Sequence, residues 1–565
     1  MLNRRQANKL VLTGVAAAIS LDAGIIPVRA QTKPVRLPLD EFVENERLLK
    51  ALRKGVAAMK QRRPSDPLSW FFQAAIHGAS EPLVTDAARI DSDVATKVDR
   101  AKYWNQCPHR GQNSANFLPW HRAYTHHFEQ ILRMHTEETD FAIPYWDYSQ
   151  PDKPGKPSNR TFPRAFGIEH LDGNTTNNDR SNINPLYYEL RDYFLCGYEH
   201  PFTDQLPLTD LSSRAVDTKP AMNSPVFFGD TEATGIGGGI ADTNPGTRGL
   251  LEQFPHDQIH RAVGGTVVGT GPNGETTSAT GAMAIPMTAG FDPIFPVHHS
   301  NMDRLWMKWS CMAGKSWGKL PAREWFEEKP WFFFDVDGKE VNRPRKDYFD
   351  FRALGVSFKD EDPNCQPLAL PVEITGPVAV AATRAAPASS QLASAQVLQI
   401  ATPVVAGVKE VKSVPLLAGA DKRAAATKSF DAVVAQAIQK PDTVTLTLHD
   451  IDTGTATATG FDLFLVAETT DQSTLTPQGP GYIGQINLFE HAGRFDQSFD
   501  VTALVAGKQR SISSLKVVIK PYALTSEPKV AGSKIAFRTG EVRIVRISLT
   551  RNAGTTILQN PSHRH

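Results

Sequence analysis

The chain has 565 residues, a net charge of +1, 41% hydrophobic residues and 9% aromatic residues. This length exceeds what a single hydrophobic core supports, so two or three domains are expected. Lysine and arginine form no basic stripe, which excludes nucleic acid as a probable class of partner. Beyond the N-terminal region no apolar run is long enough to span a membrane. We therefore expect no membrane-spanning segment in the mature protein.

The N-terminus combines a charged head, an apolar stretch and a small-residue ending. Arg4 and Arg5 precede an apolar run over residues 10–19, and Val28-Arg29-Ala30 ends the region. This order is typical of a twin-arginine export signal rather than of a buried helix. The sequence therefore predicts a signal peptide over residues 1–30 and a periplasmic or secreted protein that folds before export.

Residues 31–360 contain most of the histidines and tryptophans. Apolar residues recur at helical spacing in PWHRAYTHHFEQIL, residues 119–132, and again around HHSNMDRLWMKW, residues 298–309. Both histidine-rich segments are therefore expected on or beside helices of a mainly α-helical domain.

The composition changes after this domain. Residues 361–425 are rich in alanine, valine, serine and proline, which favours a linker. From 426 to 552, short segments alternate apolar with polar residues between turn residues, as in TVTLTLHDID. This pattern predicts a β-sandwich of about six to eight strands, followed by a flexible tail over 553–565.

Six histidines form two triplets, and each triplet could hold one metal ion. His256 and His260 are four residues apart, which places both imidazoles on one face of a helix. The triplets are His77, His109 and His121, and His256, His260 and His299.

A zinc hydrolase built on HDQIH is one alternative. Zinc proteases carry glutamate after the first histidine, whereas this chain has Asp257. A single zinc site also leaves four histidines without a role. Imidazole-only ligation suits copper, because neutral nitrogens tolerate both of its oxidation states. We therefore expect two copper ions forming a binuclear site.

Two segments carry a family resemblance. FLPWHRAYTHHFE, residues 117–129, resembles the copper-A signature of tyrosinases, catechol oxidases and molluscan haemocyanins, and DPIFPVHHSNMDRLW, residues 292–306, resembles their copper-B signature. The resemblance implies a four-helix bundle core, with dioxygen as co-substrate. It assigns His77, His109 and His121 to copper A. It assigns His256, His260 and His299, rather than His298, to copper B.

Further segments are similar to plant-type polyphenol oxidases. Residues 331–358 look like the extension that follows the catalytic domain of these enzymes, and we place the whole extension at 325–358. GFDLFLVAE and YIGQINLFEH look like strands of their C-terminal domain. The resemblance implies that this domain shields the site, and Leu475 is a candidate plug, although an ordinary surface leucine is an alternative. Proteolytic release would use basic residues of the linker: Arg384, Lys409, Lys412, Lys422 and Arg423.

Several residues have predicted roles around the metals. Cys107 and His109 match the Cys-x-His pattern that becomes a thioether in fungal tyrosinases and molluscan haemocyanins; a free buried cysteine is the alternative. Phe295 and Asp303, one helical turn on either side of His299, are expected to fix its ring by packing and as a hydrogen-bond acceptor.

Three further residues are expected to act on the substrate, and one to control access. Glu252 resembles the family glutamate that orients a water molecule, with Asp257 assisting as a base; a helix-start carboxylate is the alternative for Glu252. Arg261 either attracts a carboxylated substrate or is a solvated charge. Pro286 stands where plant enzymes often carry a bulky aromatic gate.

The sequence thus predicts oxidation of phenols and o-diphenols by dioxygen to o-quinones, including hydroxylation of monophenols. An oxygen carrier like haemocyanin is the main alternative, because it uses the same six histidines. The natural phenol, the oligomeric state and the pairing of Cys196, Cys311 and Cys365 stay open.

Overall fold

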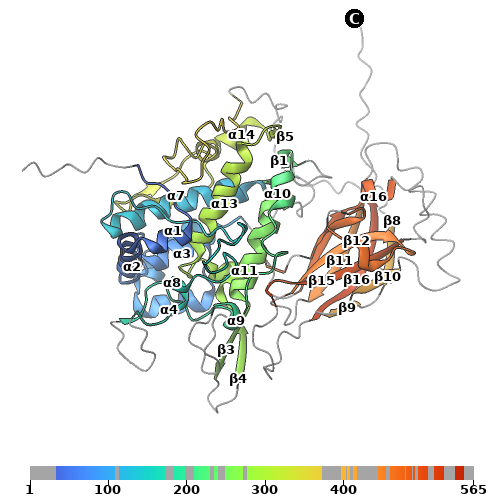
Figure 1. Cartoon of the computed structure of the whole chain (residues 1–565), viewed down its shortest axis with the longest axis horizontal. Helices are drawn as coiled ribbons and strands as arrows, with labels where there is room; N and C mark the ends of the chain where they lie inside the picture. Colours follow the sequence, from blue (N-terminus) through green and yellow to red (C-terminus); the bar gives the residue numbers. More distant parts are fainter. Residues whose placement is uncertain are drawn as a thin grey trace, which may run out of the picture. The chain divides into compact units, whose positions relative to one another are not determined.

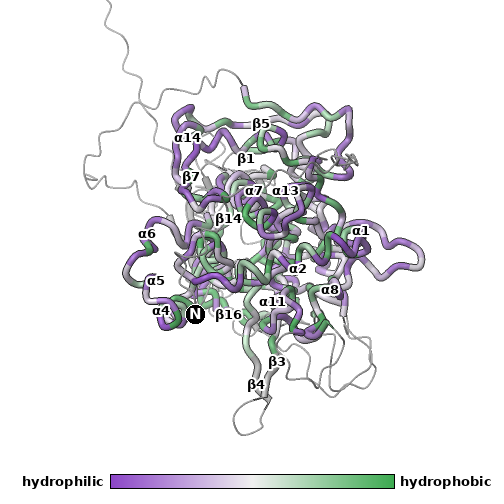
Figure 2. The backbone as a smooth tube through the Cα atoms, turned by 90° about the vertical axis from the view of Figure 1, so that its left-hand side faces the viewer, coloured by the Kyte–Doolittle hydropathy of each residue, from purple (hydrophilic) through white to green (hydrophobic). Residues whose placement is uncertain are grey.

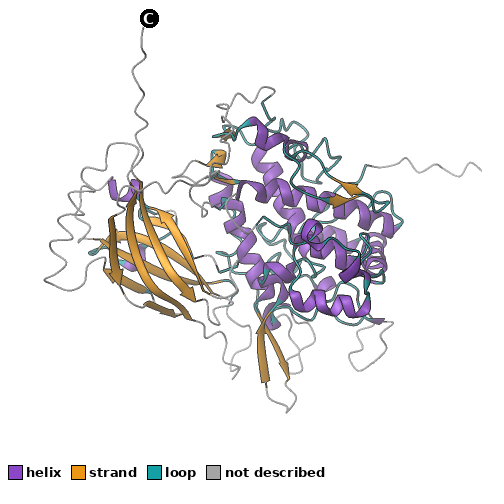
Figure 3. Ribbon diagram, turned by 180° about the vertical axis from the view of Figure 1, so that it is seen from behind, coloured by secondary structure: helices purple, strands orange, loops and turns teal. Residues whose placement is uncertain are grey.

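Two parts of different secondary structure follow one another along the chain, as the ribbon in Figure 3 shows. The computed structural model describes residues 33–108, 114–171, 182–196, 209–229, 235–239, 248–270, 276–371, 396–401, 404–407, 411–415, 443–452, 459–477, 479–486, 488–489, 494–506, 515–526 and 541–552. Residues Pro34–His565 form one compact unit. The predicted export signal at 1–30 and the tail at 553–565 lie outside the described residues.

The first part is mainly helical (Figure 1). Short strands between its helices are β1 (Val226–Gly229), β2 (Gly238–Gly239), β3 (Thr266–Thr270), β4 (Thr276–Thr280), β5 (Ser316–Gly318), β6 (Phe333–Phe334) and β7 (Glu340–Val341). Its helices are α1 (Leu39–Glu44), α2 (Glu46–Lys60), α3 (Trp70–His77), α4 (Glu81–Ile90), α5 (Asp93–Thr96), α6 (Arg100–Tyr103), α7 (Phe117–Thr136), α8 (Arg164–Gly167), α9 (Tyr193–Cys196), α10 (Lys219–Asn223), α11 (Asp257–Gly264), α12 (Pro286–Ala289), α13 (Phe295–Ser310) and α14 (Arg323–Glu327).

Local sequence explains where the two central helices begin and end. Pro119 and Pro296 lie in the first turns of α7 and α13, where a missing backbone N–H costs no intrahelical hydrogen bond. α7 stops at Glu137, whose φ of 61° is left-handed. Both helices are buried over most of their length. The chain at the surface near α1 and α14 is largely hydrophilic (Figure 2).

The second part consists of two sheets. One sheet has the strand order β10-β15-β12-β13, and the other has the order β14-β11-β16-β8, with β9 also paired to β16. The strands are β8 (Gln396–Ala401), β9 (Val404–Gly407), β10 (Lys412–Pro415), β11 (Thr443–Asp452), β12 (Thr459–Ala467), β13 (Tyr482–Gln485), β14 (Arg494–Asp500), β15 (Leu515–Ala523) and β16 (Glu541–Asn552), with a short helix α16 (Thr502–Ala506).

The inner faces of these sheets share one apolar cluster. Leu446 and Leu448 of β11 belong to the same cluster as Leu463 of β12 and Val517 of β15. Thr447, between the two buried leucines, is only partly buried, and its hydroxyl lies 2.9 Å from that of Ser498 on β14. The alternation therefore produces two packed sheets, as the sequence predicts.

The predicted linker at 361–425 is too long at both ends. Cys365 forms a disulfide with Cys311 at the end of α13, and the Leu368 amide donates to the Ser310 carbonyl, so the chain is fastened to the helical part there. At the other end, β8, β9 and β10 already pair with β15 and β16. Lys412 lies in β10, and the other four candidate cleavage residues lie outside the described residues.

Among the described residues, no helix combines the length and the hydropathy that crossing a bilayer requires.

Candidate metal centre

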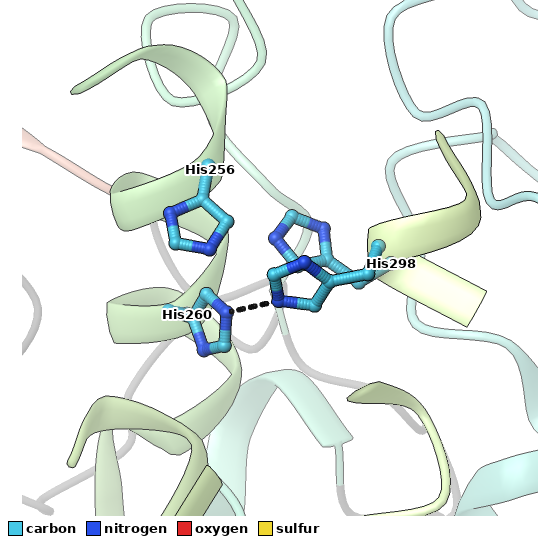
Figure 4. Close-up of side chains that lie close together, drawn as sticks. His256, His260 and His298 are labelled. Carbon is cyan, nitrogen blue, oxygen red and sulfur yellow. Dashed lines mark hydrogen bonds between the residues drawn. The ribbon is translucent and has the colours of Figure 1, made fainter. Parts of the chain in front are cut away.

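Two groups of potential metal ligands lie in the helical part, and all of their members are buried except Cys107, which is partly buried. The donor atoms of His77, Cys107 and His121 all lie within 4.8 Å of one another, and the same holds for a group of four histidines. Figure 4 shows that His256 and His260 come from neighbouring turns and that His298 faces them from another element. His109 lies outside the described residues. The second group is His256, His260, His298 and His299.

Four helices bring these side chains together. His77 is the last residue of α3, and His121 lies in the first turns of α7. His256 directly precedes α11, which contains His260 one turn later, and their ring centroids are 4.4 Å apart. α13 carries His298 and His299. The predicted histidines that are described thus converge, although they are spread over more than 220 positions of sequence.

The hydrogen bonds of the rings determine which nitrogen carries the proton and which carries the lone pair. A carbonyl oxygen can only accept, so a ring nitrogen bonded to one must carry the proton. The lone pair is then on Nε2, and such outer contacts also fix the ring orientation. The Nδ1 contacts are His77 to the Pro286 carbonyl at 3.1 Å, His121 to the Phe117 carbonyl at 2.8 Å, His260 to the Met283 carbonyl at 2.9 Å and His256 to Asp257 Oδ1 at 2.9 Å.

These tautomers fit a pair of copper ions. Each ring offers a neutral nitrogen donor, and the clusters are too buried for charged histidines. Burial lowers the pKa of His298 to about 3, and it lowers the pKa of His299 well below its usual range. Five of the six predicted imidazole ligands belong to these groups, His109 lies outside the described residues, and Cys107 and His298 are additional members.

His299, a member of the second group, also contacts the first group. Its ring stacks on that of His121, with centroids 4.3 Å apart and planes 12° apart, and its Nε2 is 3.2 Å from His260 Nε2. The Phe295 ring packs on His299 at 4.2 Å and on His77 at 4.7 Å, so the predicted packing partner is in place. His298 instead has its Nδ1 3.3 Å from the Tyr148 hydroxyl.

Asp303 does not orient His299, contrary to the prediction from their spacing. Its carboxylate oxygens accept hydrogen bonds from Arg36 and Arg122, at 2.8 Å and 2.6 Å. His299 Nδ1 has no hydrogen-bond partner among the described residues. Two guanidinium groups are stronger donors to a carboxylate than a neutral imidazole, which explains why Asp303 turns toward them.

Arg248 joins the two predicted acid–base residues. One of its nitrogens is 2.8 Å from Glu252 Oε1 and 3.1 Å from Asp257 Oδ1, and all three side chains are buried. Asp257 is thus tied both to the ligand His256 and to a guanidinium group. Sequence reasoning missed Arg248, because nothing in its neighbourhood distinguishes it from a surface arginine.

The predicted gate residue contacts a ligand through its backbone. Pro286 begins α12, its carbonyl oxygen accepts from His77 Nδ1, and its side chain is only partly buried. Its backbone therefore also orients the ring of His77, a predicted copper-A ligand.

An aromatic residue of the second part lies over the histidines. The Phe489 ring centroid is 4.5 Å from that of His260 and 5.8 Å from that of His256, and the side chain is 1% exposed. Leu475, the predicted plug, packs instead against Phe464, Val466 and Val518 within the sheet domain. The residue that covers the site is thus Phe489, which the sequence analysis did not identify.

Polar contacts between the two parts lie around Phe489. The Tyr522 hydroxyl lies 2.9 Å from Gln258 Oε1 and 2.8 Å from Gln485 Oε1, so α11 is linked to β13 and β15. Arg261 donates to the Thr459 carbonyl at 2.6 Å, and burial lowers the pKa of Arg261 to about 10. Arg261 is therefore a docking contact in this structure rather than a solvated charge.

The cysteines fall into three environments. Cys311 and Cys365 form the disulfide, which settles the pairing that the sequence left open. Cys196 is buried and has no disulfide partner. The Cys107 sulfur lies 3.6 Å from His121 Nε2, beside the copper-A donors.

Comparisons with known proteins agree with this geometry. Residues 67–312 match the common central domain of tyrosinase. The chain is 30% identical over 321 residues to a tyrosinase of Hahella sp., covering 54% of this chain and 59% of that protein. It is 30% identical over 251 residues to the chloroplastic polyphenol oxidase D of Solanum lycopersicum, covering 44% and 39%.

A solved structure of latent apple tyrosinase is also similar, with a TM-score of 0.47 at 20% identity over 92% of this chain and 98% of that one. The chain spans about half the length of the curated relatives it matches. The central-domain match includes all six predicted ligand histidines and coincides with the buried imidazole groups. Residues 67–312 are therefore similar to the common central domain of tyrosinase.

Proposed function

We propose that this protein oxidises o-diphenols to o-quinones with dioxygen. The observation that carries the proposal is the pair of adjacent buried imidazole groups whose Nδ1 atoms are tied outward. His77, His109 and His121 would hold copper A, and His256, His260 and His299 would hold copper B. When bound, two copper ions would supply a route for electrons from diphenol to dioxygen: each of two o-diphenols gives up two electrons and two protons, and one dioxygen is reduced to two water molecules.

The protein's own residues orient the reactants. Phe295 fixes the rings of His77 and His299 by contact on both. Glu252 is proposed to accept the phenol proton through a water molecule, with Asp257 keeping His256 in its neutral tautomer. Pro286 presents a smaller side chain at the gate than an aromatic residue would. These features support hydroxylation of monophenols as well as oxidation of catechols.

Turnover of catechol and of tyramine by copper-loaded protein tests this function. We expect two copper ions per chain, quinone formation from catechol, and slower quinone formation from tyramine after a lag that added diphenol shortens. An oxygen carrier would bind two copper ions and form no quinone. A zinc hydrolase would bind one zinc ion and retain no copper. Rapid catechol oxidation without any action on tyramine would refute only the monophenol part.

The second part is proposed to keep the enzyme latent. Phe489 lies against two copper-B histidines, and the polar contacts of Tyr522 and Arg261 hold it there. While the domain is docked, phenol access to His260 is obstructed. Release would also expose Arg261 next to His260, where its charge could attract a carboxylated substrate.

Cys107 is proposed to form a thioether with His109. The new carbon–sulfur bond replaces one S–H and one C–H bond, and copper with dioxygen is the oxidant. Copper-loaded protein should therefore lose two hydrogens in intact-mass analysis, because the Cys107 thiol already lies beside the copper-A donors. Cys107→Ser should abolish this loss, whereas Cys196→Ser, which removes the other free cysteine, should not. An unmodified Cys107 peptide from active protein would contradict the crosslink.

A further inference from the structure

A cluster of four charged side chains is buried beside the histidines. Arg36, Arg122, Glu129 and Asp303 are each at most 4% exposed. Arg36 Nε is 2.8 Å from Glu129 Oε2, and a second nitrogen of Arg36 is 2.8 Å from Asp303 Oδ2. Arg122 Nε is 2.6 Å from Asp303 Oδ1. Two positive and two negative charges balance, which reduces the cost of burying them.

The cluster joins three segments that are far apart in sequence. Arg122 and Glu129 are on α7, and Asp303 is on α13. Arg36 belongs to the N-terminal segment, whose backbone forms a bridge with Phe358. The Arg36 guanidinium therefore contacts both helices at once, through different nitrogens.

The same two helices carry the histidines that connect the copper groups. Arg122 directly follows His121 on α7, and Asp303 lies one turn after His299 on α13. The rings of His121 and His299 stack at 4.3 Å. The Arg122–Asp303 ion pair thus spans the helix pair next to the contact between a copper-A and a copper-B ligand.

We propose that Arg36, Arg122 and Asp303 are positioning residues that set the separation of α7 and α13, and through it the distance between the two copper ions. The inference rests on the proposed dicopper function. The predicted hydrogen bond from His299 to Asp303 is replaced by a mechanical role: Asp303, on α13, accepts hydrogen bonds from Arg122 on α7 and from Arg36.

Arginine is needed for this role because of its shape. A guanidinium group presents several N–H donors in a fixed fork and can bridge two carboxylates. A lysine ammonium is a compact charge, so it can approach Glu129 or Asp303 but does not reproduce the spread contacts of Arg36. Arg36→Lys and Arg122→Lys therefore preserve the charge balance that folding requires and remove the fixed spacing.

Electron paramagnetic resonance of the copper-loaded protein in its oxidised, copper(II) form reports the magnetic coupling between the two ions, which depends on this spacing, without turnover. Two copper(II) ions about 3.5–4 Å apart can share a bridging ligand, and their paired spins then give no signal. We expect wild-type protein to be largely silent. Arg36→Lys and Arg122→Lys should still bind two copper ions, with a severalfold larger detectable copper(II) fraction. Arg133→Lys is the matched control, because Arg133 pairs with Glu129 within α7 and has no hydrogen bond or ion pair to α13 among the described residues.

The outcomes separate the possibilities. Lysine variants that bind two copper ions and stay as silent as wild-type protein would overturn the positioning role. If both fail to fold while Arg133→Lys folds, the cluster serves folding itself and the proposal is wrong. If only one lysine variant folds, its fraction of detectable copper(II) decides the positioning role: a larger fraction than in wild-type protein supports it, and an equal fraction overturns it. Wild-type protein that binds one ion, or two uncoupled ions, would refute the dicopper function instead.

Discussion

His299→Gln is expected to remove one copper ion per chain and to lower catechol oxidation below about one thousandth of the wild-type rate, since the chemistry needs both metals. The same change at His298 should leave both ions bound. His299 Nε2 lies 3.2 Å from His260 Nε2, and its ring stacks on His121, so its loss removes a donor from the centre of the site.

The adjacent histidine provides the control. His298→Gln alters a residue on the same helix with the same burial, but the Nδ1 of His298 lies near the Tyr148 hydroxyl. Mutation of a residue that contacts metal ligands typically lowers metal affinity or activity about 10–100-fold. The His298→Gln variant should therefore keep measurable activity. Copper analysis and catechol assays on both variants compare the two roles. The ligand assignment would be reversed if His298→Gln lost the copper ion and His299→Gln retained it.

Local patterns were sufficient to predict two of the four helices that carry the site. The helical recurrence around Trp120 and Tyr124 corresponds to α7, and that around Leu305 and Trp306 corresponds to α13. Strand alternation likewise predicted the two sheets. The linker was overestimated because alanine and valine are compatible both with a flexible segment and with edge strands, and only pairing with β16 distinguishes these.

Long-range contacts account for the parts of the site that were missed. The one-turn spacing between His299 and Asp303 suggested a hydrogen bond, but Arg36, 267 residues away, takes that carboxylate. Arg248 binds Glu252 and Asp257 without any sequence motif. Phe489 ends an ordinary apolar stretch, and its contact with His260 depends on how the sheet domain docks. Periodicity describes one element at a time and contains no information on such pairings.

Phe489→Ala is expected to raise catechol oxidation by the full-length protein about tenfold if the ring contributes about 1.4 kcal/mol to the closed state, because activity follows the open population. The Phe489 ring lies 4.5 Å from His260 and would leave an open path when removed. Copper content should not change. Limited trypsin or mild detergent should have less effect on this variant than on wild-type protein, since it is already open.

Leu475→Ala is the matched comparison, because it removes an apolar side chain from the same domain at a position where the structure shows packing on Phe464 and Val518. This variant should lower the unfolding temperature of the domain and stay nearly latent at temperatures where the domain is folded. If both variants are activated equally while the domain stays folded in each, general destabilisation of the sheet domain, rather than removal of the Phe489 ring, opens the site. A folded, copper-loaded chain ending near Pro371 keeps the Cys311–Cys365 disulfide and removes Phe489, Tyr522 and every other contact that the sheet domain makes with α11. If this shorter chain is no faster than the full-length protein, the second domain does not inhibit.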